Sequence, residues 1–263
     1  MPQPLPRSRH ALVACALALL PLGAAAETLR IGVTSGPHAE IFAQVSPIAE
    51  RHGLSLELVE FDDFFAPNPA LDAGELHANS FQHQPFLDNQ VDANGYDIVS
   101  VGLTVNFPLS VFSDRHGAWE DLPEGATIAI PDDATNGGRA LLLLQGHGAL
   151  TLAEGVGLTP TPDDIIENPR GLQFRPVGAA ETPAMLAEVD AAAVNANFAQ
   201  TAGLAQPDAI LRDSATGPYA NIIAVRSTDA GADWVATLLA AYHSPEVRAF
   251  VEERFEGAVV PSW

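Results

Sequence analysis

At its midpoint the chain reads Pro131-Asp132-Asp133-Ala134-Thr135-Asn136-Gly137-Gly138-Arg139-Ala140-Leu141. A short apolar run at 127–130 precedes this stretch, and a second apolar run follows it as far as Gly146. The pattern predicts a strand, a polar glycine loop and a helix. Free backbone N–H groups in the loop, with Arg139 in the first helical turn, would suit an anion such as a carboxylate. Asn136 of the loop joins Arg139 as a candidate ligand-binding residue. The alternative is a surface arginine at an ordinary helix start.

The N-terminal region has the pattern of a secretory signal peptide. Arg7 and Arg9 precede an apolar run at 11–22, and small residues follow at 23–26. This order predicts export with cleavage after residue 26, and the apolar run is too short to span a bilayer. The residues 12–15 also spell a lipoprotein box ending in Cys15. Its use would leave a very short apolar run before the cysteine, so we favour a soluble, unlipidated protein, with lipid anchoring at Cys15 as the alternative.

The amino-acid composition excludes several kinds of chemistry. Cys15 is the single cysteine, so the exported chain has no disulfide, no thiolate metal site and no cysteine nucleophile. All 12 basic residues are arginine, and the lack of lysine excludes a Walker phosphate loop and a lysine Schiff base.

The formal net charge of −21 argues against nucleic acid or an anionic membrane as a partner. Acidic composition with arginine in place of lysine indicates either a saline habitat or GC-rich codon usage. In the first case, salt would stabilise the fold by screening self-repulsion.

Strands and helices alternate along the chain. The opening strand–helix–strand predicts a parallel pair with a right-handed crossover. We expect strands at 29–34, 54–61, 98–105, 108–113, 127–130, 172–177, 191–195, 210–213 and 219–225. We expect helices at 39–51, 85–94, up to 146, 181–188, 197–203, 231–242 and 245–255, with short helices near 66–74 and after 158–163. This order predicts the α/β class.

The domain organisation follows from the order of elements. Near Pro108 the chain can cross into a second domain, and the strand that begins at Tyr219 would return it to the first. The expected division is a signal peptide at 1–26, a first domain from 27–107 plus 218–263, and a second domain from 108–217.

Aromatic and imidazole side chains are unusually close together at 81–86. Phe81, His83 and Phe86 could form the wall of a pocket for an apolar or thioether side chain. The alternative is that both phenylalanines belong to the core and that His83 is a hydrogen-bonded loop residue.

Two asparagines lie in or at the end of apolar strands. Asn195 ends the run 191–194, and Asn221 follows Tyr219 inside another apolar run. An amide buried there needs a partner. Each asparagine is therefore a structural partner for loop backbone or a ligand contact at the carboxyl end of a strand.

Other functional classes have weaker support in the sequence. His38, His52, His77 and His83, with Asp62 and Asp63, could supply ligands for zinc, but no histidine pair has the spacing of one helix face. The segment 32–36 has the outline of a nucleophile elbow with threonine in the central place. No dinucleotide-binding fingerprint is present.

Six segments together resemble the methionine-binding proteins of ABC importers, also called NlpA-type lipoproteins. They cover the exported chain in order, and the second and fourth are the most specific. The segments are Gly36-Pro37-His38-Ala39-Glu40, 78–88, 131–141, Asp164-Ile165-Ile166-Glu167-Asn168-Pro169, 193–199 and 218–223.

The resemblance implies a two-lobed type II periplasmic binding protein with its ligand in the cleft between the lobes. It implies a monomer that binds free methionine, in L or D form, without cofactor or catalysis. Its partners would be an inner-membrane permease and the ATPase that drives it. Carried over by motif, the carboxylate and amino group would bind Arg139, Asn195 and Asn221. The ligand side chain would lie near Phe81, His83, Phe86, Phe107 and Tyr219.

The chain departs from its relatives at the aromatic side of the pocket. Relatives often have tyrosine at the positions of Phe86 and Phe198, and the position of Phe107 varies. Another small apolar amino acid or a methionine-containing dipeptide therefore stays open as the ligand.

Overall fold

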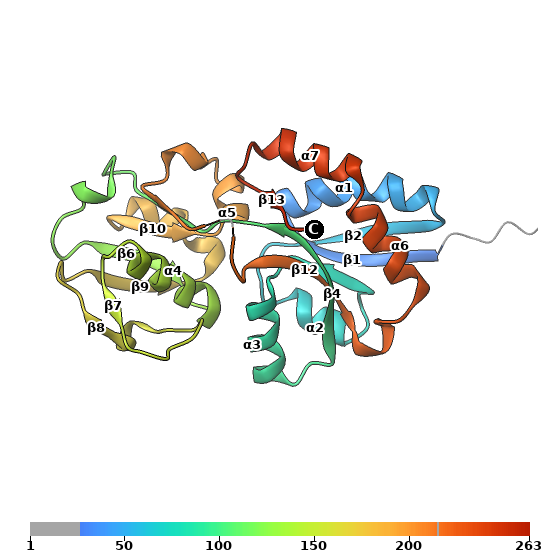
Figure 1. Ribbon diagram of the computed structural model, residues 1–263, viewed down its shortest axis with the longest axis horizontal. Helices are drawn as coiled ribbons and strands as arrows, with labels where there is room; N and C mark the ends of the chain where they lie inside the picture. The colour runs from blue at the N-terminus through green and yellow to red at the C-terminus, as the bar shows by residue number, and fades with distance from the viewer. Residues whose placement is uncertain (1–26, 215) are drawn as a thin grey trace, which may run out of the picture.

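The computed structural model describes residues 27–214 and 216–263; the expected signal peptide and Cys15 lie outside the described residues. Two α/β lobes lie side by side, and the chain crosses between them twice (Figure 1). A six-stranded sheet forms the centre of the first lobe and a five-stranded sheet that of the second. The predicted α/β class is confirmed.

The sheet of the first lobe has the order β13-β4-β12-β3-β1-β2. Its strands are β1 (Glu27–Thr34), β2 (Leu54–Phe61), β3 (Ala78–Ser80), β4 (Ile98–Asn106), β12 (Ala220–Arg226) and β13 (Val260–Pro261). β1 pairs in parallel with β2 and β3, whereas β12 pairs antiparallel with β3 and β4. The predicted parallel pair at the start of the chain and the predicted return strand are both confirmed.

Helices cover both faces of this sheet. α1 (Pro37–Arg51), α6 (Asp233–Tyr242) and α7 (Pro245–Phe255) pack on one face, and α2 (Pro67–Asp72) and α3 (Gln84–Asn94) lie on the other. β12 is buried on both faces because its side chains alternate between them. Ile223 and Val225 join the core under α1, while Ile222 and Ala224 join the core under α2 and α3.

The sheet of the second lobe has the order β11-β5-β10-β6-β9. Its strands are β5 (Ser110–Phe112), β6 (Thr127–Pro131), β9 (Gln173–Val177), β10 (Ala191–Val194) and β11 (Leu211–Arg212). α4 (Ala134–Gly146) packs through Leu141 and Leu144 on one face, and α5 (Ala196–Thr201) packs through Ala199 on the other. A small separate sheet pairs β7 (Thr151–Leu152) with β8 (Ile165–Glu167).

Two predicted helices are wrong. The short helix expected after 158–163 is a 3₁₀ turn followed by the strand β8. The region 181–188 forms two short 3₁₀ turns instead of a helix, and Pro183 precedes the second turn. Proline has no N–H to donate along a helix, so the chain must restart its turn at this residue. The strands β3, β7, β8 and β13 were not predicted. The 3₁₀ turns of the described residues are Trp119–Asp121, Pro162–Asp164, Ala179–Glu181, Ala184–Ala187, Gln206–Asp208 and Ser227–Asp229.

Two segments carry the chain between the lobes. The outgoing segment joins β4 to β5, and the returning segment joins β11 to β12. The sequence predicted crossings in both of these segments. The domain boundaries between 107 and 108 and between 217 and 218 stay a prediction.

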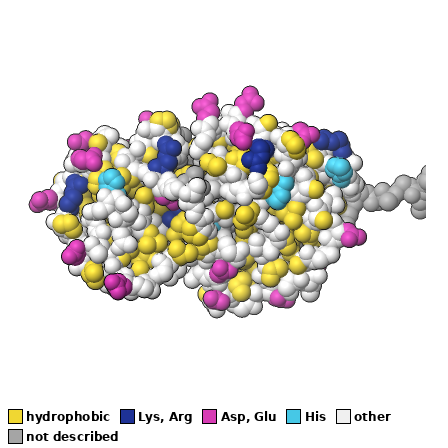
Figure 2. Space-filling view, viewed as in Figure 1, with side chains coloured by type: hydrophobic (Ala, Val, Ile, Leu, Met, Phe, Trp, Pro, Cys, Tyr) yellow, Lys and Arg dark blue, Asp and Glu magenta, His cyan; other side chains and the backbone are white. Residues whose placement is uncertain are grey.

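The surface agrees with the acidic composition. Figure 2 shows carboxylate side chains scattered over one face of both lobes, with few arginines among them. Within residues 27–214 and 216–263, no helix combines the length and the apolar character needed to cross a bilayer.

Candidate functional site

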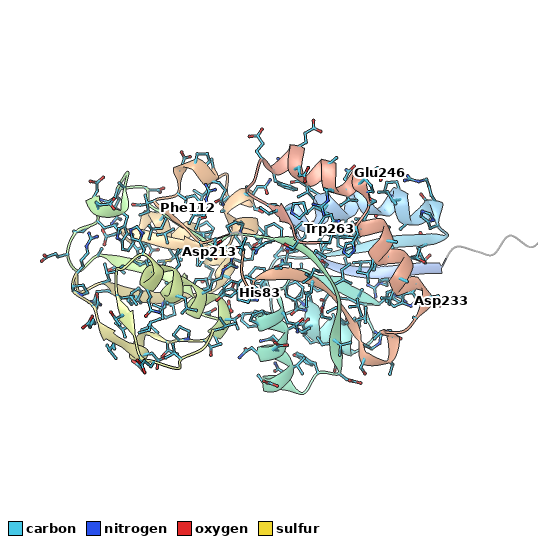
Figure 3. The ribbon with its side chains drawn as sticks, in the orientation of Figure 1. His83, Phe112, Asp213, Asp233, Glu246 and Trp263 are labelled. Carbon is cyan, nitrogen blue, oxygen red and sulfur yellow. The ribbon has the colours of Figure 1, made fainter. Side chains whose placement is uncertain are left out.

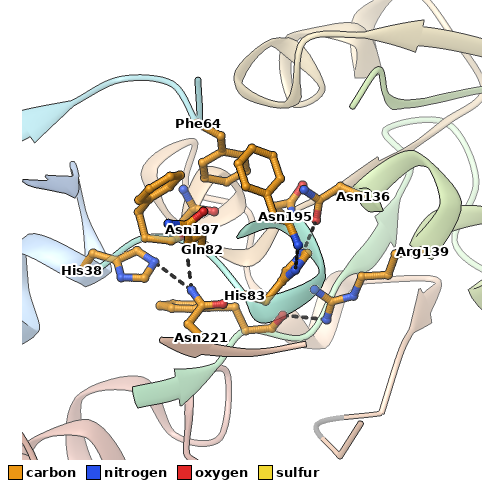
Figure 4. A pocket seen from close by; sticks show the side chains of 12 residues that line it. His38, Phe64, Gln82, His83, Asn136, Arg139, Asn195, Asn197 and Asn221 are labelled. Atoms are coloured by element: carbon orange, nitrogen blue, oxygen red, sulfur yellow. Dashed lines mark hydrogen bonds between the residues drawn. The ribbon is translucent and has the colours of Figure 1, made fainter. Parts of the chain in front are cut away.

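A cavity with an empty volume of about 330 Å³ lies where the two lobes meet (Figure 4). Its lining comes from both lobes and combines phenylalanine rings, amides, two histidines and one arginine. The residues are His38, Phe64, Phe81, Gln82, His83, Phe86, Phe107, Asn136, Arg139, Asn195, Asn197 and Asn221. Such a mixed lining suits a small ligand with one polar and one apolar part.

Asn136 is the polar centre of the cavity. Its side-chain amide donates to both carboxylate oxygens of Asp133, at 3.1 and 3.0 Å. Its Oδ1 accepts from Asn195 Nδ2 at 2.8 Å and lies 3.2 Å from His83 Nε2. Because His83 belongs to the first lobe and Asn136 to the second, this contact joins the lobes across the cavity.

His83 is a neutral donor with a defined tautomer. Its Nδ1 accepts the backbone N–H of Phe86 at 3.1 Å, so the ring proton is on Nε2 and points to Asn136. Burial, together with the nearby charge of Arg139, lowers the pKa of His83 from 6.5 to about 3. The imidazole is therefore uncharged at neutral pH.

Arg139 lies in the second turn of α4 and not in the first, because the helix begins at Ala134 with Asp133 as its N-cap. Its side chain is 3% exposed. Nε donates to Asp213 Oδ2 at 2.6 Å and Nη2 donates to the carbonyl of Phe107 at 2.8 Å. The guanidinium also lies 4.2 Å from the ring centre of Tyr219. The remaining N–H groups of Arg139, a lining residue of the cavity, are available to a ligand.

The predicted anion-binding glycine loop is wrong. Gly137 and Gly138 lie within α4, and the side chain of Asp133 already accepts the N–H of Asn136 at 2.8 Å. A Cβ on Gly137 would lie 2.6 Å from the carbonyl oxygen of Pro131, and one on Gly138 would lie 2.7 Å from a backbone oxygen at 158. The two glycines therefore allow close packing of α4 and do not form a cradle for an anion.

His38 and Asn221 form a second polar pair in the cavity. Asn221 Nδ2 donates to the carbonyl of Phe81 and to His38 Nε2, both at 3.3 Å. Because both amide protons are directed to these acceptors, Asn221 Oδ1 is the atom left for a ligand donor. Burial lowers the pKa of His38 to about 3, and its ring packs 4.6 Å from that of Phe107. His38 is thus uncharged as well.

Two cavity amides have polar atoms without a protein partner. Within the described residues, Asn195 Oδ1 and Asn197 Nδ2 are buried and make no hydrogen bond. Buried polar atoms are normally paired. These two amides therefore offer one unpaired acceptor and one unpaired donor, in addition to Asn221 Oδ1 and the guanidinium of Arg139.

The apolar side of the cavity is a cluster of phenylalanine rings. Phe64, Phe81 and Phe86 of the first lobe pack together with ring centres 6.0 to 6.1 Å apart. Phe198 of the second lobe lies 4.8 Å from Phe64. The cluster spans both lobes and can surround an apolar or thioether side chain.

Eight of the nine predicted site residues line this cavity. The ninth, Tyr219, packs behind it, with its ring 5.2 Å from His83 and against Arg139. Figure 3 shows His83 and Asp213 at the junction of the lobes. The site prediction omitted four lining residues: His38, Phe64, Gln82 and Asn197.

The histidines proposed as zinc ligands do not assemble. His77 Nδ1 instead accepts the backbone N–H of Arg30 at 2.9 Å. Among the described residues, no three histidine, cysteine, aspartate or glutamate side chains gather in a way that could hold a metal ion.

A family profile described as NlpA lipoprotein matches residues 29–263. The chain belongs to this family. Lipoprotein 28 of Escherichia coli K12 is 40% identical over 242 residues, which cover 90% of this chain and 89% of the relative. A probable D-methionine-binding lipoprotein MetQ of Vibrio cholerae is 38% identical over 237 residues, covering 89% of this chain and 88% of the relative.

Solved structures of other binding proteins share the fold. A nutrient-binding protein from Burkholderia cenocepacia, solved bound to methionine, has 46% identity and a TM-score of 0.87, covering 89% of this chain and all of the other. The methionine-binding protein MetQ has 36% identity and a TM-score of 0.87, covering 90% and 98%. The two-lobed type II binding-protein fold is confirmed. The preference for an unlipidated form is corrected, since the family and both curated relatives carry the word lipoprotein in their names.

Proposed function

We propose that this protein binds free methionine, in L or D form, and delivers it to the permease of an ABC importer. The observation that carries the proposal is the set of free polar groups in the interlobe cavity. Arg139 and the unpaired Nδ2 of Asn197 can bind a carboxylate, and the unpaired Oδ1 of Asn195 with Oδ1 of Asn221 can accept from an ammonium group. One relative is named as a probable D-methionine-binding lipoprotein and a similar structure was solved bound to methionine, which supports methionine as the ligand of this protein.

The thioether side chain would lie among the phenylalanine rings. Sulfur–aromatic contacts and apolar burial both favour methionine over a polar amino acid there. Closure of the lobes would be stabilised by the His83–Asn136 hydrogen bond and by the Phe64–Phe198 contact, since both join the two lobes. The permease would then recognise the closed form.

The mechanism is binding without covalent chemistry, by a monomer in the periplasm that works with a permease and its ATPase. We further propose that the exported chain is anchored by a lipid on Cys15, in keeping with the lipoprotein family to which it belongs. Mass spectrometry of the N-terminus tests the anchor. A mature chain that begins at residue 27 without lipid would contradict it.

The ligand is tested by calorimetry with all amino acids, both enantiomers of methionine, methionine-containing dipeptides and Zn²⁺. We expect saturable binding of methionine, with weaker binding of other apolar amino acids. If the protein binds Zn²⁺, or binds another amino acid more tightly than methionine, methionine is not its ligand.

The carboxylate contact is tested with Arg139→Ala. Removal of a charge-assisted contact should weaken methionine binding by at least about 2 kcal/mol, roughly 30-fold. Arg175→Ala is the matched control, because Arg175 pairs with Glu188 at 2.9 Å on the surface. Unchanged methionine affinity in the Arg139 variant would overturn the site.

A further inference from the structure

Asp213 is a half-buried carboxylate next to the cavity that does not itself line it. It lies directly after β11, in the segment that returns the chain to the first lobe. Its side chain is 12% exposed, and its Oδ2 accepts from Arg139 Nε at 2.6 Å. The binding mechanism proposed above gives this carboxylate no contact with the ligand.

Asp213 is fixed to the outgoing segment by two hydrogen bonds. Its Oδ1 accepts the backbone N–H of Leu109 at 2.9 Å, and its own backbone N–H donates to the carbonyl of Leu109 at 2.9 Å. Arg139 in turn donates to the carbonyl of Phe107 on the same outgoing segment. The guanidinium is therefore held by both segments that connect the lobes.

Asp213 also sets the charge of this part of the cavity. Burial raises the pKa of Asp213, while Arg139 and the N–H of Leu109 oppose that rise. His38 and His83 are uncharged, so Arg139 is the charged side chain among the described residues that line the cavity. Asp133 is a second nearby carboxylate, but its contacts are with Thr135 and Asn136 at the start of α4.

We propose that Asp213 is a positioning residue that fixes Arg139 and neutralises its charge, so that the cavity prefers a zwitterion to an anion. The inference rests on the proposed amino-acid site. A guanidinium without its counter-charge would attract any carboxylate, whether or not the ligand also has an ammonium group. With Asp213 in place, the guanidinium and the Asp213 carboxylate together have no net charge, so a ligand carboxylate alone is attracted only weakly. A ligand that also has an ammonium group is attracted in addition by the negative charge of Asp213.

The experiment compares methionine with its desamino analogue, methylthiobutanoate, which keeps the thioether and the carboxylate. Affinities of the wild type, Asp213→Asn, Asp213→Glu and a control are measured by calorimetry and by competition at one salt concentration. The control is Asp190→Asn. Asp190 also accepts a backbone N–H, from Thr127 at 2.8 Å, and lies near an arginine, but it precedes β10 at the end opposite to the cavity residue Asn195.

We expect Asp213→Asn to weaken methionine binding about tenfold and to raise the affinity of methylthiobutanoate relative to methionine at least about fivefold. Asp213→Glu keeps the charge but displaces it by one methylene. It should weaken methionine binding at least about threefold and leave the ratio of the two ligands unchanged. Asp190→Asn should change neither quantity.

The outcomes separate the inference from the proposed function. If the wild type binds neither ligand, the proposed function fails. If the wild type binds methionine and Asp213→Asn weakens both ligands by the same factor, Asp213 has only a structural role and the inference is overturned. If circular dichroism shows that the asparagine variant does not fold, the glutamate variant decides, and wild-type methionine affinity in it overturns the inference.

Discussion

Gly36 offers a direct test of whether ligand binding depends on contact between the lobes. It precedes α1 in the first lobe with φ 87° and ψ −131°, a conformation that L residues avoid. A Cβ at this position would lie 2.8 Å from Oγ1 of Thr201, at the end of α5 in the second lobe. Gly36→Ala therefore adds backbone strain in both the open and the closed form. It adds a clash between the lobes only in the closed form.

The two costs can be estimated separately. The strain amounts to about 1–3 kcal/mol and lowers the free energy of unfolding. Thr201 Oγ1 donates to the carbonyl of Asn197 at 2.9 Å. Rotating Thr201 out of the way loses this bond, about 1 kcal/mol, and leaving it in place overpacks the contact, about 1–3 kcal/mol. Since only the closed form carries this second cost of about 1–3 kcal/mol, methionine affinity should fall by between about fivefold and about 160-fold.

The measurement is calorimetric titration with methionine together with thermal unfolding. Gly53→Ala is the matched control, because Gly53 has φ 86° but nothing within 4 Å of the added Cβ. It should lose stability with unchanged affinity. Thr201→Ala combined with Gly36→Ala should restore most of the affinity. Wild-type affinity in Gly36→Ala, or no recovery in the double variant, would refute the reasoning.

Three further predictions concern charge and buried polar groups. The unfolded chain takes up protons at histidine near pH 6.5, whereas folded His38 and His83 do so at about 3, so the free energy of unfolding should fall as pH decreases through this window. The free energy of unfolding, measured with urea at several pH values, should depend less steeply on pH in His83→Gln than in the wild type. An unchanged pH dependence would speak against the burial of a neutral ring. Asn136→Ala removes the acceptor of Asn195 and His83 and should cost about 1–3 kcal/mol in unfolding free energy for each group left unpaired, whereas Asn94→Ala on α3 should cost little. With a net charge of −21, the melting temperature should rise with NaCl concentration, and a flat or falling curve would exclude the screening argument.

The regular elements of the fold could be predicted because their sequence patterns are local. Alternate residues of β2, Leu54, Leu56 and Leu58, join one core, and the apolar residues at helical spacing in α1 are buried, as their sequence patterns predict. β3 could not be predicted in this way. It has three residues, Ala78–Ser80, which are all buried, and two of them are polar. Only tertiary pairing with β1 and β12 defines it as a strand.

The candidate site was predictable where polar residues interrupt apolar strands. Asn195 and Asn221 were identified for this reason, and both line the cavity. Phe64 was not, since a phenylalanine in a loop gives no sign of which distant ring it will meet; its partner Phe198 belongs to the other lobe. Arg139 was predicted one turn too early because Gly137 and Gly138 were assigned to a loop before the helix, whereas both glycines lie within α4 and allow its close packing.

The position of β12 has a consequence for folding. This strand lies between β4 and β3 in the first sheet, yet it is supplied by residues 220–226, after the whole second lobe. All strands of the second sheet lie between 110 and 212, so that lobe has the contacts of shorter range. Because long-range pairing slows folding, we expect the lobe that is synthesised first to complete its sheet last. The emerging N-terminal half would then lack a finished core until β12 and the helices α6 and α7 after it are available, a state compatible with passage through a narrow export channel.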